Sequence, residues 1–138
     1  MRAPESASEA LELFSEWAGR VETDHRIMLA MACSDVEGRF VFKLKSPGLF
    51  MVFISDGFGL SIKCQRTFRG NPDMEITTAL FHNALFGIQN LMISLNKRQL
   101  GECFRNGDND GMFALLLELQ PVAAGIYREL ICEWRPCS

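Results

Sequence analysis

The sequence predicts an α+β fold, an antiparallel β-meander packed with three helices in the order α-β-β-β-α-β-β-α. Three observations predict it: apolar residues recur at helical spacing near both ends, they alternate with polar residues in the middle, and short turns separate the alternating runs. A chain of 138 residues is expected to form a single domain, 1–138. A content of 48% hydrophobic and 22% charged residues excludes a disordered chain, which could not build a core.

The first helix is expected over residues 6–21. Ser6 and Glu9 have the spacing of a capping box, in which each side chain binds the amide of the other residue. Apolar residues follow at intervals of three and four, and glutamates fall on the opposite face. The predicted inner face consists of Ala7, Ala10, Leu11, Phe14, Trp17, Ala18 and Val21.

Residues 39–45, 49–54 and 60–65 are predicted to be the strands of the meander. In the first and third runs apolar and polar residues alternate, which is typical of a strand with one buried face. The middle run is apolar on both faces, as expected for a central strand. Turns at 46–48 and 55–57 contain the Pro, Gly, Ser and Asp that hairpin connections favour.

The segments before and after this meander show shorter apolar patterns. The apolar run 27–33 is a possible extra strand of the sheet. After the meander, Asp73 is expected to cap a helix that ends near Gly87, because glycine often terminates helices. The runs 91–95 and 99–105 are then predicted to form a two-stranded hairpin, and the alternative is that the helix continues past Gly87 to Arg98.

The last element has two interpretations. Apolar residues keep helical spacing from Met112 to Trp134, which favours one helix kinked at Pro121. The alternative is a strand at 112–119, followed by a helix in which Pro121 occupies the first turn.

Charge and cysteine content predict a cytoplasmic protein without a cofactor. The N-terminus lacks the apolar segment of a secretory signal, and the uncharged stretch 76–96 contains too many polar residues for a membrane span. Five cysteines without a Cys-x-x-Cys pair are expected to be reduced thiols. The segment 106–111 matches the opening of a calcium loop, but Leu117 stands where a bidentate Glu is required, so no metal site is expected.

Two groups of residues are candidates for a functional site. Asp24 and His25 are adjacent, so a carboxylate could orient an imidazole base in a small enzyme or ligand-binding domain, although no nucleophile motif accompanies them. A basic strand face could be simply solvated, bind an acidic protein segment, or bind nucleic acid. That face would carry Arg39, Lys43, Lys45 and Lys63.

Strand 49–54 is apolar on both faces, yet three helices are expected to cover only one face of the sheet. Something must therefore lie against the second face. A dimer partner or a client segment is the expected answer.

The order of elements resembles the class I type III secretion chaperones, small bacterial proteins that hold effectors before export. Local features carry the resemblance: the turn Asp56-Gly57 before an alternating strand, and Asn83-Ala84-Leu85-Phe86 closing the second helix. A strand at 91–95 and a last helix ending in Trp134-Arg135 complete it.

The resemblance implies a homodimer without enzymatic activity that binds the extended N-terminal segment of an effector by β-addition and apolar pockets. It implies partner-binding residues on the first helix and the sheet: Leu13, Phe14, Trp17, Arg39, Val41, Lys43, Phe50 and Val52. It implies a dimer interface on the second helix and the strand after it: Leu80, Asn83, Phe86, Leu91 and Ile93.

Overall fold

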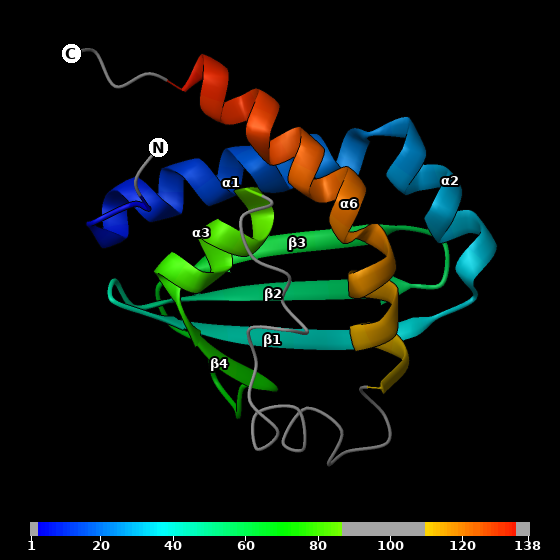
Figure 1. Cartoon of the computed structure of the whole chain (residues 1–138). Coiled ribbons are helices and arrows are strands. Elements are labelled where there is room, and N and C mark those ends of the chain that lie inside the picture. Colours follow the sequence, from blue (N-terminus) through cyan, green and yellow to red (C-terminus); the bar gives the residue numbers. More distant parts are fainter. Residues whose placement is uncertain (1–2, 87–109, 135–138) are drawn as a thin grey trace.

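The structure, a computed structural model, describes residues 3–86 and 110–134 (Figure 1). These residues form four helices and a four-stranded mixed sheet, which confirms the predicted α+β class. The elements are, in chain order, α1 (Ala7–Thr23), α2 (His25–Ser34), β1 (Glu37–Lys45), β2 (Leu49–Asp56), β3 (Leu60–Gln65), β4 (Met74–Thr77), α3 (Thr78–Phe86) and α6 (Asp110–Glu133).

Helix α1 is capped by Ser6, as its sequence predicts, but the Glu9 side chain binds the amide of Glu5 and not that of Ser6. The Ser6 side chain accepts a hydrogen bond from the Glu9 amide at 3.1 Å, and the Glu9 carboxylate accepts one from the Glu5 amide at 3.4 Å. Most of the predicted inner face is buried, but Ala7 and Leu11 are half-buried. Leu13, which was not assigned to this face, is fully buried, while Glu12 and Glu16 are exposed. The helical period of the apolar residues therefore set both the type of element and its orientation.

The run 27–33 is a helix, α2, and the interpretation of this segment as a strand was wrong. The Asp24 carboxylate caps the helix by accepting hydrogen bonds from the amides of Arg26 and Ile27, at 2.9 and 3.4 Å. Ile27 and Met31, four residues apart, are the buried positions, which is a helical interval. Met28 and Leu29, which lie between them, are apolar although they are exposed, and this hid the helical period in the sequence.

The meander has the predicted antiparallel pairing of β1 with β2 and of β2 with β3. The fourth strand was not predicted, because a helix was expected from Asp73 onward. Residues 74–77 instead form β4, which pairs with β1 in parallel and makes the sheet order β3-β2-β1-β4. Met74 and Ile76 are buried while Glu75 and Thr77 are exposed, which is the two-residue period of a strand.

The C-terminal segment is one helix, α6, with Pro121 inside it, as the favoured interpretation predicted; the structure shows no strand at 112–119. Its buried residues keep helical spacing on both sides of the proline, from Met112 to Ile131. The predicted hairpin of 91–95 and 99–105 lies outside the described residues.

Helices and sheet share one hydrophobic core (Figure 1). The inner face of the sheet carries Phe40, Phe42 and Phe53, which pack against residues of α1, α3 and α6. Trp17 of α1 lies at the centre, where its indole N–H donates to the Ala123 carbonyl of α6 at 3.0 Å. All the buried helix positions meet the sheet from the same side, so the opposite face of the sheet is left to other segments.

Candidate interaction surface

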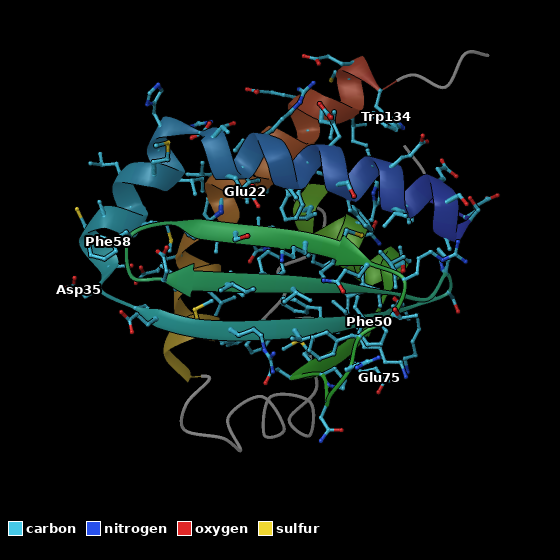
Figure 2. All side chains as sticks on the ribbon, turned by 180° about the vertical axis from the view of Figure 1, so that it is seen from behind. Glu22, Asp35, Phe50, Phe58, Glu75 and Trp134 are labelled. Carbon is cyan, nitrogen blue, oxygen red and sulfur yellow. The ribbon has the colours of Figure 1, made fainter. Side chains whose placement is uncertain are left out.

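The face of the sheet that points away from the helices, here called the outer face, is the candidate site. Figure 2 looks onto this face, with Phe50 and Glu75 in front of the helical layer. Strand pairing places Arg39 opposite Ile54, Val41 opposite Val52, and Lys43 opposite Phe50. The outer face consists of Arg39, Val41, Lys43, Lys45, Phe50, Val52, Ile54, Ser61, Lys63, Gln65, Glu75 and Thr77, by the alternation along the four strands.

Part of the outer face is covered by the chain itself, through Phe68 of the segment 66–73. The ring of Phe68 packs on Phe50 with centroids 5.8 Å apart, and the Arg39 guanidinium lies 5.2 Å from its centroid. Because Arg39 and Phe50 stand at either end of the Val41–Val52 pair, Phe68 spans that pair. Both valines are buried although neither belongs to the main core.

Asp73 fastens this segment to β1. Its carboxylate accepts a hydrogen bond from the Val41 amide at 2.7 Å, and its own amide donates to the Val41 carbonyl at 2.8 Å. Burial raises the pKa of the Asp73 carboxyl, while the Val41 amide and the charge of Arg39 act in the opposite direction. The segment that carries Phe68 is therefore held in register with the strand that it covers.

The outer face carries more basic than acidic residues. Lys43 and Lys45 approach the Glu75 carboxylate at 4.0 and 3.2 Å, so one acid serves two lysines. Further bases lie at Arg39 and Lys63 on the strands and at Arg66 and Arg69 on the covering segment, and all four are exposed. Acidic residues, Glu37 and Asp56, mark the end of the face next to the β2–β3 turn.

The structure brings together five of the residues predicted to bind a partner. These five are Arg39, Val41, Lys43, Phe50 and Val52, which are neighbours on β1 and β2. The other three, Leu13, Phe14 and Trp17, lie on the opposite side of the sheet. They are fully or almost fully buried in the core and have no exposed surface to offer a client.

The predicted dimer residues lie on and after α3. Leu80 and Asn83 are half-buried, and Phe86 is the last residue of the helix. Leu91 and Ile93 lie outside the described residues. The strongest apolar exposure in the described structure occurs elsewhere, on α2 and the β2–β3 turn.

Asp24 and His25 do not form the pair that an imidazole base requires. The Asp24 carboxylate caps α2 and binds the Arg26 guanidinium through Nε and an Nη atom, at 3.1 and 3.0 Å. This interaction with Arg26 is the main reason why the pKa of Asp24 is lowered. His25 is exposed at the surface of the first turn.

One apolar pocket of about 60 Å³ lies between the helices and the inner face of the sheet. Its lining includes Trp17, Phe42, Phe53, Phe81 and Phe113, and Gln120 provides an amide. The Gln120 side chain donates to the Ala84 carbonyl at 3.3 Å. None of the lining side chains is ionisable, so the lining offers no group for acid–base chemistry.

Metal and membrane features were sought within residues 3–86 and 110–134. In those ranges no three His, Cys, Asp or Glu side chains come together in a way that could hold a metal ion. None of the helices described there is long and apolar enough to span a bilayer. Cys33, Cys64 and Cys132 are free thiols, and burial raises the pKa of Cys64 to about 12.

Sequence reasoning missed Phe68 and Asp73 as parts of the surface. Residues 69–73 were interpreted only as a break in the sheet, with Asp73 as a helix cap, and Phe68 was given no role. The available signal was an isolated Phe between two arginines, at 66–69, directly after a basic strand.

Comparisons with models of protein families, with curated proteins and with solved structures found no match to this chain.

Proposed function

We propose that the outer face binds an extended, acidic segment of another protein, and that the chain is a chaperone-like binding protein rather than an enzyme. This proposal follows the resemblance to class I type III secretion chaperones. The client would be the N-terminal segment of a secreted effector, held in the cytoplasm by a homodimer.

One observation carries the proposal: an apolar strip bordered by cations on a sheet face over which none of the four described helices packs. Phe50, Ile54 and Phe68 are half-buried on this strip, and Arg39 and Lys63 border it. The whole chain has a net charge of −3, so the positive field is a local property of this face. Apolar contacts would supply affinity, and the cations would select acidic partners.

Nucleic acid is a second class of partner whose negative charge would complement the basic residues of the outer face. The ion pairs on this face argue against it. Glu75 neutralises part of the charge of Lys43 and Lys45, and Arg39 faces both Phe68 and Asp73. A phosphate backbone gains affinity mainly from unpaired cations, whereas an acidic peptide also uses the apolar strip.

Fluorescence anisotropy tests the proposal with a labelled, unstructured peptide that alternates Glu with Leu. We expect saturable binding that weakens as NaCl is raised, because exposed charges are screened. Reversal of a bordering charge, Lys63→Glu, should weaken binding by ~10-fold. The matched control is Arg128→Glu, which makes the same change of charge at an exposed position on α6 and should leave binding unchanged.

Two results would contradict the proposal. Equal weakening by both variants would show a response to net charge alone. Tighter binding of a thymidine oligonucleotide than of the peptide would identify the outer face as a nucleic-acid surface.

A further inference from the structure

Helix α2 is apolar on the side that faces solvent as well as on the side that faces the core. After the first turn, its outward side carries only Met28, Leu29, Ala32 and Cys33, all exposed. The exposed fractions are 52% for Met28 and 68% for Leu29. Outward positions of α1 carry glutamates instead. A helix that is apolar all round is normally buried, so this face of α2 needs a cover.

Phe58 extends this face at the C-terminal end of α2. It lies at the tip of the β2–β3 turn and is 84% exposed. The turn is held beside the chain that leaves α2, because Glu37 pairs with Asp56 and the Ser55 hydroxyl donates to the Val36 carbonyl. Figure 2 shows Phe58 and Asp35 at the same end of the molecule. Together α2 and the turn, here called the α2 patch, carry the three large hydrophobic side chains that are exposed in the described residues.

The charges around this patch differ between its two ends. His25 and Arg26 are exposed at the N-terminal end of α2, and Arg26 also binds Asp24. The C-terminal end is acidic, with Asp35, Glu37 and Asp56 all exposed. A second copy laid parallel would place these acids against each other. An antiparallel copy instead places them near the exposed Arg26 and the positive end of the helix dipole of the partner, and it opposes the two helix dipoles.

We propose that this patch binds a second copy of the chain, with the two α2 helices packed antiparallel about a twofold axis. Such an interface is self-complementary, as closed dimers require. The inference rests on the proposed function only for the existence of a homodimer. It assigns the contact to α2 and Phe58 instead of α3, and it leaves the outer face open to the client.

Three matched alanine substitutions separate the possible interfaces. Ala32 lies on α2, Ala79 on α3 and Ala114 on α6, and all three are exposed helical alanines. Light scattering after size exclusion should give a wild-type mass of twice 15.6 kDa. We expect Ala32→Glu to give the monomer mass, because a buried unpaired carboxylate opposes the contact. Ala79→Glu and Ala114→Glu should remain dimers.

The orientation is tested by disulfide trapping. In a background with Cys64, Cys103, Cys132 and Cys137 replaced by serine, Met28→Cys should form a covalent dimer with Cys33 of the second copy under mild oxidation. The control adds Cys33→Ser and should remain unlinked. Efficient linking through Cys33 alone, without Met28→Cys, would indicate a parallel pair and overturn the antiparallel arrangement.

Other results overturn the inference as a whole. A wild-type monomer at high protein concentration, or a dimer that only Ala79→Glu disrupts, would remove α2 as the interface. An Ala32→Glu variant that stays dimeric but no longer binds the acidic peptide would show that a client covers the patch. Because one readout is mass and the other is peptide binding, failure of this inference and failure of the proposed function are distinguishable.

Discussion

A single carboxylate, Asp24, ends α1 and begins α2. Its amide donates to the Val21 carbonyl, and its side chain accepts from the first amides of α2 and from Arg26. Asp24→Ala should therefore destabilise the protein by about 1 kcal/mol in chemical denaturation, the usual cost of a lost helix cap. Asp24→Asn keeps a capping oxygen and should cost less.

The same carboxylate predicts a pH dependence. The interaction with Arg26 lowers the pKa of Asp24, so between its folded and unfolded pKa values the unfolded chain binds more protons. The resulting stabilisation is present above the unfolded pKa and is lost as the pH falls through the folded one. The stability difference between wild type and Asp24→Asn should therefore shrink from pH 6 toward pH 2, as urea titrations at each pH would show. A constant difference would mean that Asp24 acts as a neutral cap.

Tyr127 and His82 form a buried polar pair beside the hydrophobic core. The Tyr127 hydroxyl and His82 Nδ1 lie 2.7 Å apart between α6 and α3, and burial raises the pKa of Tyr127. Tyr127→Phe should lower the free energy of unfolding by ~1–3 kcal/mol, because it removes one partner of a buried hydrogen bond. A double-mutant cycle with His82→Leu isolates the pair, since the double variant should lose less than the sum of the single ones. Additive losses would show that the pair is not coupled.

Among the elements, strand β3 lies at the edge of the sheet, and α1 limits its ability to hydrogen-bond to a strand of another molecule. The Glu22 carboxylate of α1 accepts a hydrogen bond from the Ile62 amide, a donor that would otherwise be open to another strand. Glu22→Ala should speed hydrogen exchange of the Ile62 amide by ~10-fold or more and make the protein more prone to self-associate. The control is Glu16→Ala on the same helix, where Glu16 binds Arg20 instead. Unchanged exchange at Ile62 would show that Glu22 does not protect this edge.

How well the sequence predicts an element depends on how sharply its two faces differ. Helix α1 and strands β1 and β3 have one apolar and one more polar face, so their periods are visible in the sequence. The central strand β2 is apolar on both faces and was predicted from a short apolar run between two turns. These predictions were confirmed. Helix α2 is apolar on both faces, and this feature, which makes it a candidate interface, also removed the helical period. Strand β4 has only four residues, too few to establish a period in the sequence. Its position depends on Asp73, which binds Val41, a residue 32 positions away in the chain.

The same limit applies to the candidate surface, of which only the part that follows from strand alternation was predictable from the sequence. Strand alternation alone placed Arg39, Val41 and Lys43 on one face, and the pairing with β2 added Phe50 and Val52. The contribution of Phe68 depends on where a connecting segment returns, which local patterns do not encode. Leu13, Phe14 and Trp17 were assigned to the client by resemblance, whereas the spacing of Phe14 and Trp17 already placed them on the apolar face of α1.

At the scale of the whole molecule, the apolar side chains of the described residues lie in three places. Most of these side chains are buried in the core. Some lie on the outer face, where the segment 66–73 covers part of them, and those of α2 and Phe58 are exposed. The outer face is basic and the α2 patch is acidic at one end, so the two surfaces select different partners. The proposed client and the proposed second copy would therefore occupy separate surfaces.

If the α2 patch pairs two copies, folding and assembly are linked by mass action. The midpoint of thermal unfolding of the wild type should then rise by roughly 2–4 °C for each tenfold increase in protein concentration, because unfolding of a dimer releases two chains. Ala32→Glu should unfold at a midpoint that does not depend on concentration, and Ala114→Glu should behave as the wild type. Calorimetry over a hundredfold range of concentration measures this directly. A wild-type midpoint that stays constant over that range would show that the exposed face of α2 adds nothing to stability through a second copy.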